Sequence, residues 1–294
     1  MIIVYETVCE STRIDNIASA QALKGCTKIN GSLEIYINDQ DSQIVQELHE
    51  YLKDLVEITG YLRIARSFPL ITLNFLRNLK LIRGDTLERN IYSLLIFDNP
   101  NLQDLWPFKS DEFLVNGDEK RIRILRGQIF VHLNPKLCYQ RILSMIDYVD
   151  GLHQPWDERD VSSHSNGDKV PCNVTVLDVR IKEIGPVMVI IEFENFANKM
   201  EDQRSLVGYL IYTREAEHRN VTIFDGVNAC SNNEWTVREY DAVENDNNTY
   251  HEHLITNFKP FTQYALYIKT YTINTVNKGA QSEIKYFITK PDSK

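Results

Sequence analysis

The sequence predicts a mainly β protein in two parts, an α+β leucine-rich solenoid followed by a β-sandwich. Three observations support this fold class. Short apolar strands recur through the first half, a polar stretch begins near residue 151, and strand-like segments separated by turns fill the remainder. A length of 294 residues agrees with two domains, because one hydrophobic core stops growing at roughly 250–300 residues.

The recurring strands indicate a solenoid in which each turn contributes one strand. They are predicted over Gly31–Ile37, Gly60–Arg66, Tyr92–Asp98 and Gly127–Leu133, at intervals of 29, 32 and 35 residues. Branched apolar residues stand at alternate positions, so one face of every strand points into a shared interior. Asn99-Pro100 and Asn134-Pro135 follow two of these strands at the same offset and predict turns at equivalent corners.

Three amphipathic segments predict helices that close the ends of this solenoid. They cover residues 16–24, 42–55 and 136–149. Asp15 is placed to cap the first helix and Gly25 to end it. The apolar stripes indicate core packing, and nothing in them indicates a cofactor.

The composition changes near residue 151. We expect the solenoid over residues 1–151, a polar linker over 152–171 and the sandwich over 172–294. Sandwich strands are predicted over 173–181, 187–193, 206–213, 252–258, 263–274 and 282–288. Residues 215–250 form a long polar insertion. Insertions of this length usually have a function or are disordered. Tyr264 opens a strand after a Pro-x-Thr turn, which is typical of a tyrosine corner.

The net charge of −9 argues against nucleic acid as a partner, because Lys and Arg supply most of that affinity. No apolar run approaches the roughly 20 residues that span a bilayer. The apolar start, Met1–Val4, is too short for a signal peptide and has no basic segment before it. We therefore expect any signal peptide and transmembrane helix to lie outside this sequence.

The cysteines show no Cys-x-x-Cys pair and no spacing typical of a zinc site. They are Cys9, Cys26, Cys138, Cys172 and Cys230. One interpretation is five buried thiols in a cytosolic protein. In a secreted protein, an odd cysteine would instead indicate an intermolecular bond or a reactive thiol.

Four glycosylation sequons favour the secretory pathway over the cytosol. They stand at Asn30, Asn173, Asn220 and Asn247. Together with the widely spaced cysteines, they predict an extracellular glycoprotein.

Motifs that carry catalysis are missing from the sequence. No nucleophile triad, phosphate-binding loop or kinase motif occurs, so we expect neither enzyme activity nor a cofactor. His251 and His253 share one face of a strand, but two histidines alone are a weak chelate, and we expect no metal. Arg83-Gly84-Asp85 spells an integrin-binding tripeptide, yet it falls inside the repeat pattern and is interpreted as structural.

Long stretches of the sequence resemble the ectodomain of insulin and insulin-like growth factor receptors. Residues 20–37, 60–106 and 134–138 are similar to the second L domain of that family, a leucine-rich, right-handed β-helix-like solenoid. The most specific runs are Gly25–Leu33, Leu79–Leu87 and Asp98–Trp106. Residues 172–289 resemble the family's first fibronectin type III domain, above all over Asn220–Val237. The runs follow the family's order and together cover nearly all of residues 9–289.

The resemblance implies a disulfide plan. Cys9 would pair with Cys26 inside the L domain, and Cys138 with Cys172 would tie the L domain to the fibronectin domain. Cys230 would join two receptor halves across a two-fold axis, as suits an isologous homodimer. The alternative for Cys230 is a thiol on a mobile loop.

The resemblance also implies a hormone-contact surface on the fibronectin domain. The matching positions are Val187, Met188, Glu192, His253 and Leu254. Leu254 keeps the family's character, whereas Met188 and Glu192 replace basic residues and His253 replaces an aromatic one. We expect a surface for a differently charged hormone, and an ordinary sandwich surface is the alternative.

As a whole, the resemblance implies an extracellular fragment of a transmembrane receptor tyrosine kinase. The chain would act as a dimer scaffold and a secondary contact for an insulin-like peptide hormone, together with the remainder of the receptor ectodomain. The L domain would serve mostly as a rigid spacer. The alternatives are a secreted decoy that binds insulin-like peptides and an adhesion module that uses the same folds.

Overall fold

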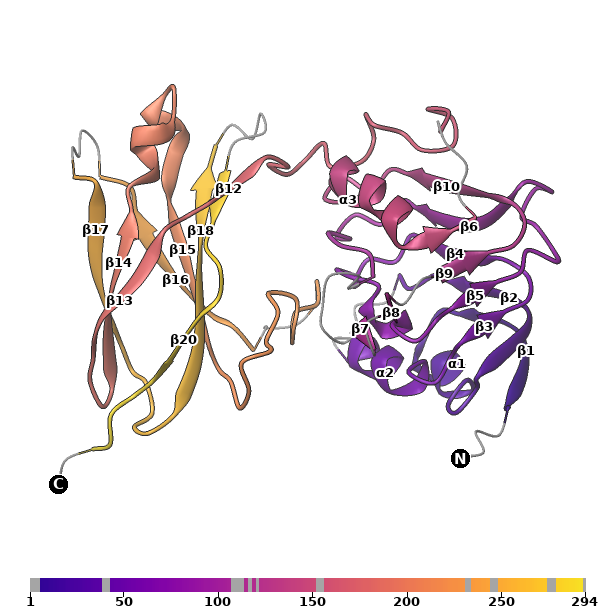
Figure 1. The fold of residues 1–294 in the computed structure, drawn as a ribbon, viewed down its shortest axis with the longest axis horizontal. Helices are drawn as coiled ribbons and strands as arrows, with labels where there is room; N and C mark the ends of the chain where they lie inside the picture. The colour runs from indigo at the N-terminus through magenta and orange to yellow at the C-terminus, as the bar shows by residue number, and fades with distance from the viewer. Residues whose placement is uncertain are drawn as a thin grey trace. The chain divides into compact units, whose positions relative to one another are not determined.

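The computed structural model describes residues 6–38, 43–106, 114–115, 118–119, 122–151, 156–230, 234–243, 248–273 and 279–292. The chain divides into two compact units. The first contains residues 1–170 together with 228–231, and the second contains residues 171–227 together with 232–294. Figure 1 shows both units, and each is described by itself below.

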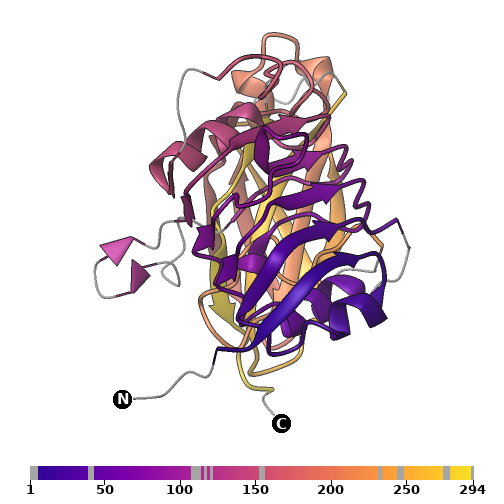
Figure 2. The same cartoon turned by 90° about the vertical axis from the view of Figure 1, so that its right-hand side faces the viewer.

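The first unit is a solenoid of parallel strands. Its strands are β1 (Val8–Ile14), β2 (Lys28–Ile35), β3 (Glu57–Ile58), β4 (Leu62–Ala65), β5 (Leu81–Ile82), β6 (Tyr92–Phe97), β9 (Ile122–Ile124), β10 (Gln128–His132) and β11 (Val149–Asp150). The order is β10-β6-β4-β2-β3-β5-β9-β11, with β1 also on β2. Figure 2 shows the strands stacked from indigo at one end to magenta at the other. A hairpin, β7 (Leu114–Val115) with β8 (Asp118–Glu119), lies outside this sheet.

The four predicted repeat strands are confirmed as β2, β4, β6 and β10, although each is shorter than predicted or shifted at its ends. Their alternating apolar residues stack in register. Ile35, Ile64 and Ile96 occupy one position across three strands, and each is fully buried. Because burying one such side chain contributes roughly 1.5–3 kcal/mol, these stacks hold neighbouring turns together.

The predicted helices are present but shorter. They are α1 (Ile17–Gln21), α2 (Ile44–Tyr51) and α3 (Tyr139–Leu143), the last followed by the 3₁₀ helix η3 (Ser144–Asp147); another, η1 (Asn74–Leu76), lies between β4 and β5. The cap predicted at Asp15 is wrong by one residue. Asn16 has extended backbone angles and its side chain accepts the Ser19 N–H, which makes Asn16 the N-cap.

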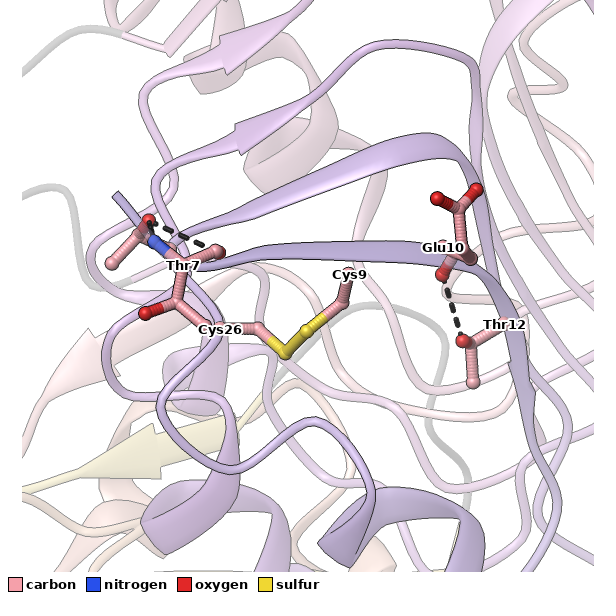
Figure 3. Close-up of a disulfide and its surroundings, with 6 residues drawn as sticks. Thr7, Cys9, Glu10, Thr12 and Cys26 are labelled. Carbon is pink, nitrogen blue, oxygen red and sulfur yellow. Dashed lines mark hydrogen bonds between the residues drawn. A yellow bond between two sulfur atoms is a disulfide. The ribbon is translucent and has the colours of Figure 1, made fainter. Parts of the chain in front are cut away.

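A disulfide links Cys9 of β1 to Cys26, which lies just before β2. Figure 3 shows it beside the start of the first strand. Thr7 and Thr27 exchange hydrogen bonds at 2.9 and 3.0 Å next to it. The covalent bond and the hydrogen bonds together hold the outermost strand onto the solenoid.

Residues 156–170 belong to the solenoid, in contrast to the linker predicted over 152–171. Val161 lies in the hydrophobic core and forms a parallel bridge with Val131 of β10. Asn166 forms a second parallel bridge with Asn134. The prediction failed because two polar side chains of this segment, Ser162 and Asn166, are buried and hydrogen-bonded, so their polarity does not indicate exposure.

Buried asparagines form a ladder along one corner of the solenoid. The Ser67 N–H donates to Asn99 Oδ1 at 3.0 Å, and the Asn99 N–H donates to Asn134 Oδ1 at 3.2 Å. The Asn134 N–H donates in turn to Asn166 Oδ1 at 3.2 Å. All four side chains are buried, so each turn satisfies the backbone of the turn before it.

The second unit is a β-sandwich. One sheet contains β13 (Val179–Ile184), β14 (Met188–Glu194) and β17 (Tyr250–Thr256), in that order. The other contains β12 (Val174–Val176), β19 (Gly279–Gln281), β18 (Gln263–Thr272), β15 (Leu206–Glu215) and β16 (Thr236–Asp241), with β20 (Lys285–Ile288) also on β18. Short 3₁₀ helices, η4 (Phe196–Lys199) and η5 (Gln203–Ser205), join β14 to β15. Ile191 and Phe193 from the first sheet share one core with Ile211 and Ile268 from the second.

The insertion predicted over 215–250 is in large part ordered against the larger sheet. It contains the whole of β16, which the sequence pattern missed. Trp235 and Tyr267 pack edge to face with ring centroids 4.9 Å apart, in a small core on the side of β15 and β18 that faces away from the main core. Val221 joins this cluster, and its N–H donates to the Tyr286 hydroxyl at 3.1 Å.

Tyr264, predicted as a tyrosine corner, lies at the second residue of β18. Its hydroxyl accepts the Lys259 N–H at 2.9 Å, and its ring packs against Phe258 and Phe287. The bond returns to backbone a few residues upstream, which is the geometry of such a corner.

Candidate functional site

The outward face of the sheet β13-β14-β17 is the candidate site. Along β14 the burial alternates strictly: Val189, Ile191 and Phe193 point into the core, whereas the residues between them are partly exposed. Met188 and Glu192, two of the predicted contact residues, therefore lie on the outward face.

Strand pairing brings Leu254 to the same face. Leu254 of β17 is the direct cross-strand partner of Ile190 in β14, and its side chain is 52% exposed. Ile190 was absent from the predicted contacts, although its position between Met188 and Glu192 follows from the two-residue period of a strand. Met188, Ile190 and Leu254 form an apolar strip on this face, and Val187, 48% exposed, directly precedes β14.

Charged groups occupy the other end of this face. Glu192 pairs with Lys182 at 3.0 Å and with Arg180 at 3.5 Å. Arg180 also lies over the ring of Tyr250, 4.7 Å from its centroid. A ligand that contacts Glu192 must therefore compete with two cations already bound to it.

His253 does not lie with the other predicted contacts. It pairs with Ile191, whose side chain faces the core, so His253 is on the inner side of β17. Its ring packs edge to face on Tyr240 with centroids 5.2 Å apart. Burial, helped by the nearby positive charge of Arg238, lowers the pKa of His253 below its usual value. The prediction that His253 contacts a ligand on the outward face is not supported by this placement.

The arrangement offers a surface that a peptide can contact. Within the described part of the chain, no group of His, Cys, Asp and Glu side chains is positioned to hold a metal ion. His251 is buried and packs against the rings of Phe193 and Tyr209. An apolar strip beside a charged end can bury a complementary peptide surface and orient it.

Comparison with known proteins places these two units in one family. The sequence model of the receptor L domain family matches residues 25–148. The insulin receptor of Xenopus laevis is 38% identical over 94% of this chain, and the insulin-like peptide receptor of Branchiostoma lanceolatum is 37% identical over 97%. The insulin-like growth factor 1 receptor of Xenopus laevis is 33% identical over 96%. The chain belongs to the insulin receptor family.

The match covers one segment of these insulin receptor family members. The chain spans 20% of the length of each of these three relatives. None of the helices in the described residues is both long and apolar enough to cross a membrane. The solenoid is the part that the receptor L domain match covers, and the sandwich follows it.

The remaining predicted disulfide residues are Cys138, Cys172 and Cys230. Cys138 and Cys172 are both disulfide-bonded, and their pairing with each other stays a prediction. Cys230 carries a half-buried thiol, and its backbone N–H donates to the Asn228 side chain at 2.8 Å. Its use as an interchain bond of the family also stays a prediction.

Three of the predicted glycosylation sites are accessible. Asn30, Asn173 and Asn220 are exposed, as attachment of a glycan requires, and Asn247 lies outside the described residues. Occupancy of these sites stays a prediction.

The Arg83-Gly84-Asp85 tripeptide has a structural explanation. Arg83 pairs with Glu57 at 2.5 Å. Gly84 has φ +72°, and a Cβ there would lie 2.2 Å from the Arg126 carbonyl oxygen. This glycine is required where two solenoid turns approach closely, which agrees with the interpretation of the tripeptide as structural.

Proposed function

We propose that this chain is an extracellular portion of an insulin-like peptide receptor, in which it scaffolds the receptor dimer and supplies a secondary contact for the hormone. The main support for this proposal is that nearly the whole length of this chain is similar to insulin-type receptors. The hormone contact is assigned to the outward face of β13-β14-β17, because Leu254 is exposed there beside the partly exposed Met188 and Ile190.

The contact would be made by Leu254, Ile190, Met188 and Val187. These side chains can bury apolar area against a helix or turn of the hormone, whereas Glu192 at the other end of the face is already paired with Lys182 and Arg180. Binding would favour one arrangement of the two receptor halves over another and so shift an equilibrium that exists without hormone.

Leu254→Asp in the dimeric receptor ectodomain tests the hormone contact. It places a charge where the proposed interface is apolar. We expect the affinity for an insulin-like peptide of the same source to fall about tenfold or more, since a leucine contributes roughly 1.5–3 kcal/mol on burial. Calorimetric titration measures this change.

Val237→Asp is the matched control. Val237 is a 44% exposed valine on β16, in the other sheet, and its replacement should leave the affinity unchanged. Unchanged hormone affinity of Leu254→Asp in a folded dimer would contradict the assignment of the hormone contact to this face. Saturable binding by this chain without the rest of the ectodomain would favour a secreted decoy.

A further inference from the structure

A pocket with a volume of about 350 Å³ opens at one edge of the sandwich. The strands β15 and β16 of the larger sheet supply Thr213, Thr236 and Arg238 to its lining. The chain that follows β17 of the smaller sheet supplies Asn257 and Phe258. Both β16 and β17 are edge strands of their sheets, so no further strand of either sheet covers the pocket.

The register of β15 and β16 turns Arg238 toward the space between the sheets. Arg238 is the cross-strand partner of Ile211, whose side chain lies in the main core. Because cross-strand partners share one face of a sheet, the Arg238 side chain begins on the inner side. Its guanidinium donates to Thr213 Oγ1 at 2.9 Å and to the Thr256 carbonyl at 3.1 Å. These bonds hold the guanidinium at the pocket wall, 5.7 Å from the centroid of the Phe258 ring.

The other charged groups of the pocket are paired with one another. Arg214 lies 2.6 Å from Glu234, and Lys259 lies 2.6 Å from Glu215. Arg238 has no carboxylate within ion-pair distance among the residues that the structure describes. Burial lowers the pKa of Arg238, and no carboxylate is close enough to offset this effect. These residues comprise three cations and two carboxylates, which leaves one positive charge in excess.

Hydrogen-bond donors at the pocket wall remain available. A guanidinium has five N–H donors, and Arg238 uses two of them on Thr213 and Thr256. The Thr213 hydroxyl accepts one of these bonds and keeps its own proton to donate. Thr236 and Asn257 are exposed, and their side chains make no hydrogen bond to other described residues. An anion in the pocket can therefore be bound by the guanidinium and by neutral donors together.

We propose that this pocket binds a small organic monocarboxylate, with its carboxylate on Arg238 and its apolar body against the ring of Phe258. A planar carboxylate matches the guanidinium fork, and its single charge balances the single unpaired cation. Phe258 packs on Tyr264, which also lines the pocket, so the apolar body meets aromatic surface. The volume lies at the lower end of the range for small-molecule pockets, which favours a compact ligand.

Dianions fit this pocket less well than a monocarboxylate. Glu215 and Glu234 belong to the lining, and each of these side chains is about half exposed. A second negative charge on the ligand would be repelled by these carboxylates, whereas a single charge is satisfied by Arg238. The site is separate from the proposed hormone contact, because Leu254 lies on the outward face of β17 and the pocket opens between the sheets.

Fluorine NMR titration of the intact chain tests the proposal with para-fluorobenzoate as the probe. The matched analogue is para-fluorobenzamide, which has nearly the same shape and no charge. We expect the benzoate to bind saturably and the benzamide to bind about tenfold more weakly, because the charge-assisted bond is lost. Arg238→Met keeps most of the side-chain bulk and removes the charge, so it should weaken the benzoate to the same extent.

Thr236→Glu is an independent variant. Thr236 is exposed on an edge strand, and it lies two residues from Arg238 on the same face of that strand. The new carboxylate should occupy Arg238 and abolish binding of the benzoate. Arg204→Met is the control, because Arg204 pairs with Asp202 and lies outside the pocket, and this variant should bind the benzoate unchanged.

Equal binding of the benzoate and the benzamide would overturn the proposal, because it would show apolar contact alone. Absence of saturable benzoate binding by the native chain, or full binding by Arg238→Met or Thr236→Glu, would also overturn it. Displacement of the benzoate by an equal concentration of sulfate would do the same, because it would reveal a general anion site. If Arg238→Met does not fold, Thr236→Glu and the two probes still decide.

Discussion

Single polar side chains decide how the turns of the solenoid join. Asn134 alone donates to the carbonyls of Ile96 and His132 and accepts from both the backbone and the side chain of Asn99. An apolar residue of similar size would leave these buried groups without partners. Leaving a buried polar group without a partner costs more free energy than an average hydrogen bond contributes. Loss of one of these asparagines should therefore destabilise the solenoid more than loss of one average hydrogen bond.

Replacing Asn134 with Ala tests the ladder. We expect the free energy of unfolding of the solenoid to fall by about 3 kcal/mol, since several buried donors and acceptors lose their partner at once. Urea denaturation followed by circular dichroism measures it. Asn101→Ala is the control: Asn101 bonds the Phe68 carbonyl near the surface, where water can substitute. Equal losses in both variants would contradict the special role of the ladder.

His253 provides a prediction about pH. Its pKa is lowered first by burial and then by Arg238, so the folded state binds a proton less readily than the unfolded state. Its contribution to stability is therefore complete above its unfolded pKa and is lost as the pH falls toward the folded pKa and below. Histidine NMR titration should find a pKa below about 6.5. Arg238→Met should raise that pKa only partly, and a normal pKa in the native protein would refute the inner placement.

At the scale of elements, the insertion before β16 is bound to the sandwich as a unit. The Trp235 indole N–H and the Arg214 guanidinium both donate to the Asp225 carbonyl, at 3.1 and 2.9 Å. The Thr222 side chain and backbone bond the Asp225 carboxylate and tighten the turn between them. These hydrogen bonds therefore hold the residues around Asp225, which precede Cys230 in the chain, against the small core.

Trp235→Ala should release this segment while leaving the main sandwich core intact. The small core loses its largest side chain, at a cost on the order of 3–5 kcal/mol. Limited trypsin digestion should then cut after the exposed Arg219 much faster than in the native chain. Val237→Ala, an exposed change two residues further along, is the control. Unchanged cleavage in Trp235→Ala would show that the segment is anchored elsewhere.

At the scale of the whole molecule, one cysteine decides the proposed assembly. Four cysteines are disulfide-bonded, and Cys230 has a half-buried thiol at the end of the anchored segment. One self-paired cysteine in each chain suits a dimer related by a two-fold axis, because the same surface then meets itself.

Cys230→Ser therefore tests the dimer. The secreted native chain, kept oxidised, is expected at twice the mass of a single chain by intact mass spectrometry, and Cys230→Ser at the single mass. Reduction should convert the native sample to monomer. A native sample that is monomeric without reductant would contradict the dimer.

The positions of many strands could be predicted from the alternation of apolar residues in the sequence. It predicted the strands that carry Ile35, Ile64 and Ile96, because a period of two is a local property of the chain. It likewise predicted that strands carry Met188 and Leu254. The tyrosine corner at Tyr264 could also be predicted because its signal is local: the Pro-x-Thr turn and the backbone that it bonds lie within a few residues.

Only the tertiary structure decided which side chains meet across strands. The pairing of Ile190 with Leu254, and of His253 with the inward Ile191, depends on a register between segments some sixty residues apart. The burial of Asn166 and Trp235 depends on partners 32 residues away, Asn134 and Tyr267. Such contacts form only when the chain closes long loops, and local periodicity carries no information about which distant segment returns.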